Sequence, residues 1–164
     1  MEDIKIIPLA GDNLVQALSV LHESFESFND VEHPDKWFPA SLNPKGNTQL
    51  YQSLKIKDCR YFVAVNTKEQ VIGTTGLYHF EDQPKEAWVG WYCVKPSEQG
   101  KGFGKKILEW TINKAKEEGN EKLKLYTRPD FDTALSLYDK FGFKDTKQEM
   151  FEGELALYKE LSLI

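Results

Sequence analysis

The first part of the chain combines a short apolar run with a longer amphipathic segment. Residues 4–9 are mostly apolar and predict a strand. Pro8 ends this strand or confines it to a sheet edge, because proline has no backbone N–H to donate. Asp12 or Asn13 can then cap a helix. Apolar residues recur behind them at helical spacing and predict a core-facing helix: Leu14, Leu18, Leu21 and Phe25.

Residues 28–46 interrupt this periodicity. Three prolines fall within the segment, so the sequence predicts an irregular stretch there. Long loops in compact domains are commonly functional. Two interpretations stay open: the acids and aromatics line a pocket for an amine, or Trp37 and Phe38 pin a surface loop to the core. The acids in question are Asp30, Glu32 and Asp35.

The middle of the chain changes to the period of strands. Residues 47–57 predict a second helix, and strands follow over residues 60–65, 71–78 and 88–94. Short polar or charged turns join these strands, which is typical of an antiparallel meander.

The last third predicts helices over residues 106–118 and 133–141, a strand over 122–127, and a hairpin of 143–150 with 154–161. The strands on either side of the first helix predict a parallel crossover. We therefore expect an α/β fold, with a mixed, mostly antiparallel sheet of about seven strands and helices on both faces. Residues 1–164 are expected to form a single domain.

Composition and charge narrow the class of protein. The chain has 164 residues and a formal net charge of −5, whereas a nucleic-acid partner would favour a basic face. No apolar run reaches the length of a membrane span, and the acidic N-terminus is unlike a signal peptide. Cys59 and Cys93 lack metal-ligand spacing, so we expect reduced thiols and a cytoplasmic protein.

Three glycines occupy the predicted turn between the third strand of the meander and the next helix: Gly100, Gly102 and Gly104. Because glycine has no Cβ, an anion can approach the backbone N–H groups closely. These groups also lie at the positive end of the helix dipole. Lys101 and Lys105 add positive charge, so the turn predicts a socket for a phosphate or pyrophosphate.

Three phosphate-binding patterns can be compared with this turn. A P-loop needs a hydroxyl residue after its lysine, but Lys106 follows Lys105. A dinucleotide fingerprint needs a third glycine where Lys105 stands, and a doubly wound sheet that the meander contradicts. The pattern Q/R-x-x-G-x-G/A fits Gln99, Gly102 and Gly104.

Residues 94–104, Val-Lys-Pro-Ser-Glu-Gln-Gly-Lys-Gly-Phe-Gly, resemble the coenzyme-A signature of the GNAT superfamily of N-acetyltransferases. Residues 134–143, Ala-Leu-Ser-Leu-Tyr-Asp-Lys-Phe-Gly-Phe, resemble a second family stretch, A-x-x-L-Y-x-K-x-G-F. The two stretches occur in the family's order and at its usual separation. The predicted elements also match over essentially the whole chain, so the resemblance implies the acyl-CoA N-acyltransferase fold.

The resemblance implies roles for individual residues. The backbone of Tyr92, Cys93 and Val94 would pair with the pantetheine arm, and one of its N–H groups would polarise the thioester carbonyl. Tyr138 matches the tyrosine that protonates the leaving thiolate, and its ordinary pKa keeps it protonated at neutral pH. Acetyl-CoA is the implied co-substrate, and no metal is expected. The turn residues implied to hold the coenzyme are Gln99, Gly100, Lys101, Gly102, Phe103, Gly104 and Lys105.

Two departures from the family pattern concern the mechanism. Phe131 stands where many members carry an asparagine that contacts the coenzyme. The places of a catalytic glutamate in some members hold Trp88 and Tyr126, and neither side chain can act as a base. The alternatives left open for the general base are Glu86, Glu81, His79 and a water molecule.

The leading hypothesis is therefore acetyl transfer from acetyl-CoA to a primary amine by direct attack in a ternary complex. A covalent acyl-enzyme at Cys93 is not expected, because a buried strand thiol is usually inert. The competing hypotheses are a non-catalytic acyl-CoA-binding or sensing module and, with less support, a nucleotide-binding protein. The acceptor is a small-molecule or peptide amine whose class stays open, and a homodimer is also left open.

Overall fold

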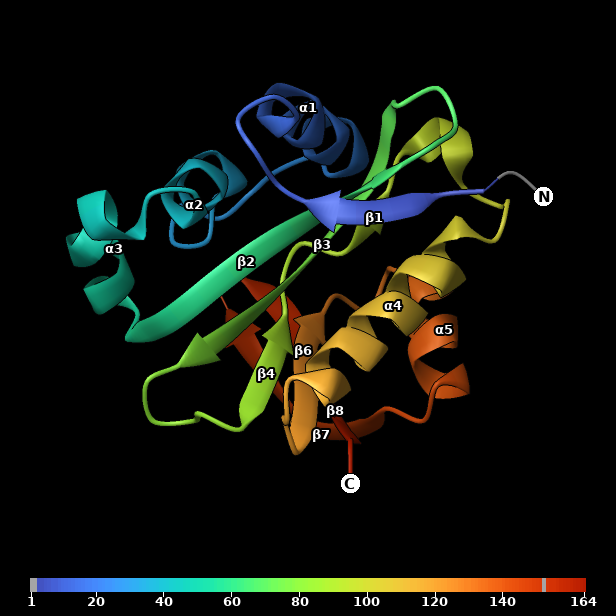
Figure 1. Ribbon diagram of the computed structural model, residues 1–164. Helices are drawn as coiled ribbons and strands as arrows, with labels where there is room; N and C mark the ends of the chain where they lie inside the picture. Colours follow the sequence, from blue (N-terminus) through green and yellow to red (C-terminus); the bar gives the residue numbers. More distant parts are fainter. Residues whose placement is uncertain (1–2, 152) are drawn as a thin grey trace.

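The fold is built on one eight-stranded sheet, which the computed structural model describes for residues 3–151 and 153–164 (Figure 1). The strand order is β1-β2-β3-β4-β6-β8-β7, and β5 also pairs with β3. Among the described residues only β4 and β6 run parallel, so the predicted mixed, mostly antiparallel sheet is confirmed, with eight strands rather than about seven. The strands are β1 (Lys5–Pro8), β2 (Ile56–Val65), β3 (Val71–Phe80), β4 (Glu86–Val89), β5 (Cys93–Val94), β6 (Lys122–Thr127), β7 (Lys144–Phe151) and β8 (Glu154–Ser162).

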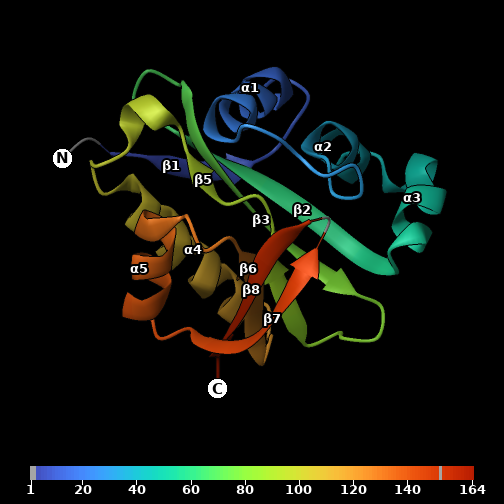
Figure 2. The same ribbon diagram turned by 180° about the vertical axis from the view of Figure 1, so that it is seen from behind.

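Helices cover both faces of the sheet, as predicted (Figures 1 and 2), although the described residues form five α-helices rather than four. Adjacent residues of a strand point to opposite faces. Val63 packs with α1 and α2, whereas its neighbour Ala64 packs with α4. None of the described helices has the length and apolar character that a membrane crossing requires. The α-helices are α1 (Leu14–Ser24), α2 (Pro34–Ser41), α3 (Thr48–Ser53), α4 (Phe103–Glu117) and α5 (Asp132–Lys140), with 3₁₀ turns at Pro44–Asn47 and Pro96–Glu98.

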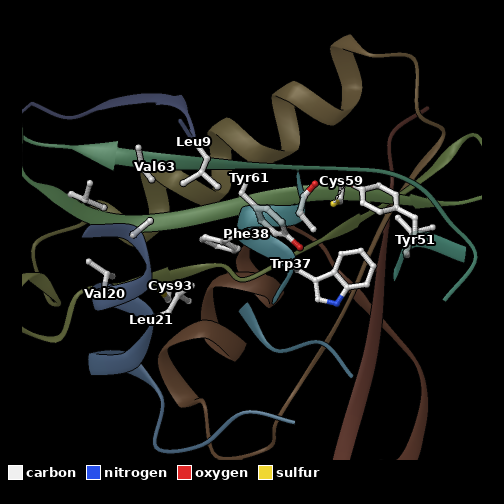
Figure 3. Close-up of a cluster of buried hydrophobic side chains, with 14 residues drawn as sticks. Leu9, Val20, Leu21, Trp37, Phe38, Tyr51, Cys59, Tyr61, Val63 and Cys93 are labelled. Carbon is white, nitrogen blue, oxygen red and sulfur yellow. Dashed lines mark hydrogen bonds between the residues drawn. The ribbon is translucent and has the colours of Figure 1, made fainter. Parts of the chain in front are cut away.

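The core under α1, α2 and α3 is aromatic (Figure 3). Phe38 is fully buried and stacks on Tyr61, with ring centroids 4.2 Å apart. The Tyr51 hydroxyl and the Cys59 sulfur lie 3.2 Å apart, so one hydrogen bonds to the other. Both cysteines are buried and unpaired with each other, which confirms the predicted reduced thiols.

The core on the opposite face holds α4 and α5 against β3, β4 and β6. Leu108 and Leu123 are fully buried there, beside Leu125 and Tyr138. The hydroxyls of Thr75 and Thr111 lie 2.8 Å apart inside this layer. Because the Thr111 hydroxyl donates to the Ile107 carbonyl, it accepts from Thr75, and this bond ties α4 to β3. This helix carries the glycine turn at its N-terminus.

Residues 28–46 differ from the predicted irregular stretch because they contain α2. Pro34 occupies the first turn, where a missing N–H costs nothing. His33 Nδ1 accepts a hydrogen bond from the Asp35 N–H at 3.2 Å and caps the helix. Burial of Trp37 and Phe38 stabilises the helix despite Pro39 in its interior. The predicted helix over residues 47–57 is shorter than expected, since α3 ends at Ser53 and β2 begins at Ile56.

The predicted strand over residues 88–94 is divided into β4 and β5. Both pieces pair antiparallel with β3, so the predicted meander is confirmed. Between them Trp91 has φ 45°, a left-handed conformation that bulky residues rarely adopt. The Gly90 N–H donates to the Gly76 carbonyl at 2.9 Å, which keeps the interruption attached to β3.

Gly73 of β3 allows the backbone of β5 to approach closely. A Cβ at Gly73 would lie 2.8 Å from the Cys93 carbonyl oxygen and 2.8 Å from Ile107 Cδ1. We expect Gly73→Ala to lower the free energy of unfolding by about 1–3 kcal/mol, because the backbone of β5 must move. Gly11→Ala is the matched control, since a Cβ there meets no atom within 4 Å and the expected change is within about 0.5 kcal/mol. Urea denaturation measures both, and equal stabilities would contradict this packing.

Candidate active site

A cavity of about 310 Å³ lies where β4 and β6 separate. The two strands are paired in parallel from Glu86–Lys122 to Trp88–Lys124, which is the last pair among the described residues. Beyond this pair the two strands no longer pair with each other, and residues at both strand ends line the cavity. Tyr61 from the α1–α2 face and Tyr138 from the α5 face both reach it. The cavity therefore connects the two faces of the sheet through its interior.

The predicted glycine turn presents backbone donors at the start of α4. Gly100 has φ 80° and Gly102 has φ 86°, both in the left-handed region that glycine enters without strain. The Lys106 N–H bonds to the Gly102 carbonyl at 3.4 Å, so the N–H groups before it precede the helical ladder. Phe103 is buried in the core beside Ala64 and Ile107. This arrangement suits an anionic ligand.

Polar side chains around the turn mainly support it. Gln99 Nε2 donates to the Val94 carbonyl oxygen at 3.1 Å, which ties the turn to β5. Lys101 Nζ lies 2.8 Å from Glu98 Oε2 at the surface, and the Lys105 side chain is exposed. The Gln99 side chain thus stabilises the turn against β5.

Gly104, predicted to contact the coenzyme, has a packing role in the structure. The Tyr92 hydroxyl donates to the Gly104 carbonyl at 2.7 Å. A Cβ at Gly104 would lie 3.1 Å from that hydroxyl, so a side chain here would press on Tyr92. Tyr92 is therefore held by α4, with its ring 6.2 Å from the ring of Tyr138.

Tyr138 projects from α5 into the cavity lining. Only 5% of it is exposed, and its ring packs edge-on against Phe143 at 5.6 Å. Burial raises the pKa of the Tyr138 hydroxyl well above its ordinary value, because the phenolate would lose its hydration. The hydroxyl is protonated at neutral pH and can donate a proton inside the cavity.

Trp91 anchors the opposite wall of the cavity. Its indole Nε1 donates to the Glu32 carbonyl at 3.1 Å, and its own carbonyl accepts from Thr74 Oγ1 at 2.6 Å. The rings of Phe25 and Phe28 lie 5.4 and 5.3 Å from its ring. These contacts bring the segment between α1 and α2 over the cavity.

Glu32 contributes a carboxylate to this wall. Burial raises the pKa of Tyr78 most, and the negative charge of Glu32 is the next cause; for Tyr61 the charge of Glu32 raises the pKa only after burial, Cys59 and Tyr78. Glu32, Tyr61 and Tyr78 all line the cavity. The sequence marked Glu32 only as one acid of an irregular segment, and it gave no signal for the placement of Trp91.

The candidate bases lie elsewhere, since the described lining of the cavity includes none of the three. Glu86 Oε2 is 2.9 Å from Lys124 Nζ. His79 is held between Asp58 Oδ1 at 2.8 Å and Asn120 Oδ1 at 2.7 Å. Glu81 is exposed in the turn after β3.

The two other residues singled out in the sequence have clear positions. Phe131 lines the cavity, with its ring 5.8 Å from Phe25. Cys93 is buried outside the described lining, 3.3 Å from Thr74 Oγ1, and burial raises the pKa of its thiol. A neutral thiol in this position is a poor nucleophile. Among the described residues, no three His, Cys, Asp or Glu side chains gather in a group that could hold a metal ion.

Comparisons with known proteins agree with this geometry. The family described as "Acetyltransferase (GNAT) family" matches residues 19–143. The chain is 28% identical over 113 residues to the spermine/spermidine N(1)-acetyltransferase of Bacillus subtilis (strain 168), covering 64% of this chain and 74% of that protein.

Solved structures of low identity share the fold. The ribosomal-protein-S18-alanine N-acetyltransferase from Escherichia coli is 18% identical, with a TM-score of 0.74 over 98% of this chain and 94% of that chain. A chimera of the spermidine N-acetyltransferase SpeG from Vibrio cholerae and hSSAT is 17% identical, with a TM-score of 0.71 over 98% and 95%. The fold implied by the sequence resemblance is confirmed.

The raised pKa of Tyr138 predicts a pH dependence of stability. Above about pH 10 an unfolded tyrosine loses its proton while the folded Tyr138 keeps it, so stability falls as the pH rises. Tyr138→Phe removes this contribution. We expect the loss of unfolding free energy between about pH 10 and 11 to be smaller by about 1 kcal/mol in the variant. Urea denaturation at each pH measures it, and identical losses would mean that Tyr138 ionises as freely folded as unfolded.

Proposed function

The chain belongs to the acetyltransferase (GNAT) family, and from this premise we propose that residues 1–164 form one catalytic domain that acetylates a primary amine. The amine attacks acetyl-CoA directly within a ternary complex. The family implies the use of acetyl-CoA. One observation carries the proposal: a single cavity has the protonated Tyr138 in its lining on one side and the Glu32 carboxylate on the other.

The coenzyme is proposed to lie between the glycine turn and the parted strands. The backbone N–H groups from Gly100 to Lys105 bind its pyrophosphate, supported by the turn geometry and the positive end of α4. The backbone of Tyr92, Cys93 and Val94 pairs with the pantetheine arm. Gln99 holds this strand and the turn together through its bond to the Val94 carbonyl.

The proton transfers are assigned to the two sides of the cavity. The acceptor enters as an ammonium ion and gives a proton to Glu32, directly or through water. A backbone N–H at the edge of the strand beside Tyr92 polarises the thioester carbonyl as the neutral amine attacks. Tyr138, which is protonated at neutral pH, then gives its proton to the departing thiolate, and the second proton that the attacking nitrogen loses in becoming an amide restores the Tyr138 hydroxyl.

A second candidate is a non-catalytic acyl-CoA-binding module. It is favoured by the position of Glu86, Glu81 and His79 outside the described lining. A coenzyme-A thiol-release assay over a panel of primary amines separates the two candidates. Turnover supports the enzyme, binding of acetyl-CoA without turnover on any amine supports the module, and failure to bind acetyl-CoA contradicts both.

Removal of the Tyr138 hydroxyl tests the general acid. We expect Tyr138→Phe to lower kcat by roughly 10²–10⁴-fold with little change in the affinity for acetyl-CoA, because the ring still packs on Phe143. Steady-state kinetics and calorimetric titration with acetyl-CoA measure the two effects. An unchanged kcat would remove Tyr138 from the mechanism.

Substitution of Gly100 and Gly119 tests whether the glycine turn binds the phosphate of acetyl-CoA. Gly100 and Gly119 have φ 80° and 85°, and a Cβ at either meets no atom within 4 Å. Alanine at either position therefore carries a similar backbone strain of about 1 kcal/mol. Gly100→Ala should raise the Kd for acetyl-CoA about 10-fold or more, because its Cβ enters the space of the phosphate, and Gly119→Ala should leave the Kd unchanged. Equal effects on binding would mean that the phosphate lies elsewhere.

A further inference from the structure

The chain between β4 and β5 contains one more residue than the part of β3 that it faces. Leu77 of β3 pairs with Val89 of β4, whereas Thr74 of β3 pairs with Cys93 of β5. Three steps along β3 therefore correspond to four steps along the facing chain. Such an extra residue is a β-bulge, and the left-handed φ of 45° at Trp91 locates it there. Bulges change the direction in which neighbouring groups point, so the groups of this bulge need a separate account.

Thr74 binds the backbone of this bulge with its side chain. Its hydroxyl Oγ1 donates to the Trp91 carbonyl oxygen at 2.6 Å, and the residue is fully buried. Thr74 Oγ1 also lies 3.3 Å from Cys93 Sγ. Because threonine has a single hydroxyl proton, which Trp91 receives, the Cys93 thiol is the donor in this second contact. A buried chain of two hydrogen bonds therefore fixes the direction of the Trp91 carbonyl.

The direction of this carbonyl determines where the next N–H points. No peptide bond of the described residues is cis, so the Trp91 C=O and the Tyr92 N–H point in opposite directions across a trans plane. Since the carbonyl points to Thr74 on β3, the Tyr92 N–H points away from β3. In the strand order β6 lies on the far side of this segment from β3, and the end of β6 lines the cavity together with Trp91 and Tyr92. The Tyr92 N–H is therefore directed to the side on which the strands have separated.

We propose that Thr74 is a positioning residue for acetyl transfer: its hydroxyl holds the Trp91–Tyr92 peptide so that the Tyr92 N–H is presented to the thioester carbonyl oxygen. The inference rests on the proposed transfer from acetyl-CoA, and it adds to that reaction a residue outside the described cavity lining. An N–H that is fixed before the substrate binds stabilises the developing negative charge without reorganisation. Without the Thr74 hydroxyl the peptide can rotate, and the N–H loses its fixed direction.

The thioester carbonyl of bound acetyl-CoA reports on this N–H without any amine present. Isotope-edited infrared spectroscopy of the full-length protein with acetyl-CoA labelled with ¹³C at the carbonyl compares the bound and the free coenzyme. A hydrogen bond to the oxygen weakens the C=O bond, so we expect the wild-type protein to move the band to lower wavenumber. Thr74→Val should lose this shift, while the Kd for acetyl-CoA, measured by calorimetric titration, stays within about 3-fold.

The adjacent threonine provides the matched control. Thr75 is equally buried, and its hydroxyl bonds to Thr111 on the opposite face of the sheet. Thr75→Val, and Thr74→Ser, which keeps the hydroxyl, should both retain the shift. With an accepted amine, kcat should fall about 10-fold or more in Thr74→Val and stay within about 2-fold in these two variants. Thr74→Ala removes the hydroxyl without adding bulk and takes the place of the valine variant if that variant does not fold.

The outcomes separate this inference from the proposed enzyme. Equal bands for the wild type and Thr74→Val overturn the role of Thr74 and leave acetyl transfer standing. No shift in the wild type, or loss of the shift in Thr75→Val as well, also overturns it. A shift that is lost in Thr74→Val and kept in Thr74→Ser supports the role, even if the wild-type protein acetylates no amine, a result that would overturn the proposed enzyme instead.

Discussion

Separation of β4 from β6 after the Trp88–Lys124 pair is the constraint on which the site depends. Two parallel strands normally continue to hydrogen-bond, and the interior between them would then be closed. Here the chain turns at Trp91, in a left-handed conformation that costs a bulky residue about 1–2 kcal/mol. Hydrogen bonds to Thr74 and Glu32 and two aromatic contacts offset this strain. One strained residue thereby opens the sheet and also holds the wall that covers the opening.

The two halves of the proposed site use different parts of the residues: one uses mainly backbone groups, and the other uses side chains. The donor half consists of backbone N–H groups, a helix terminus and glycines at Gly100 and Gly102 with positive φ. These features need particular residues at fixed spacing, so a short motif predicts them. The proposed acceptor half consists of side chains from the α1–α2 segment, α2, β2, β3 and α5 that meet only in three dimensions. No spacing along the chain predicts which of its acids will face inward.

This difference explains what the sequence could and could not predict. Apolar periodicity located β6 at its observed bounds and α5 within one residue. It missed α2, because Pro34 and Pro39 argue against a helix unless the burial of Trp37 and Phe38 is known. It also missed the break at Trp91, since no local signal marks a positive φ at a tryptophan. The general base stays a prediction among several alternatives, since proximity to the ends of strands did not show that His79 is held by Asp58 and Asn120.

The proton balance of the proposed reaction explains why the site needs both a proton acceptor and a proton donor. An ammonium ion and a thioester give an amide, a thiol and one free proton, so the site must first remove a proton from the amine and later supply one to the thiolate. A carboxylate and a buried phenol meet these two needs only if their environments differ. Tyr138 is enclosed by Phe143 and Tyr92, and burial keeps its hydroxyl protonated at neutral pH. Glu32 is only half-buried on the segment between α1 and α2, so that, in the proposed reaction, a proton taken from the amine is close to solvent. The parted strands connect these two environments through the interior of the sheet, so the same opening that admits the substrates also separates the proton acceptor from the proton donor.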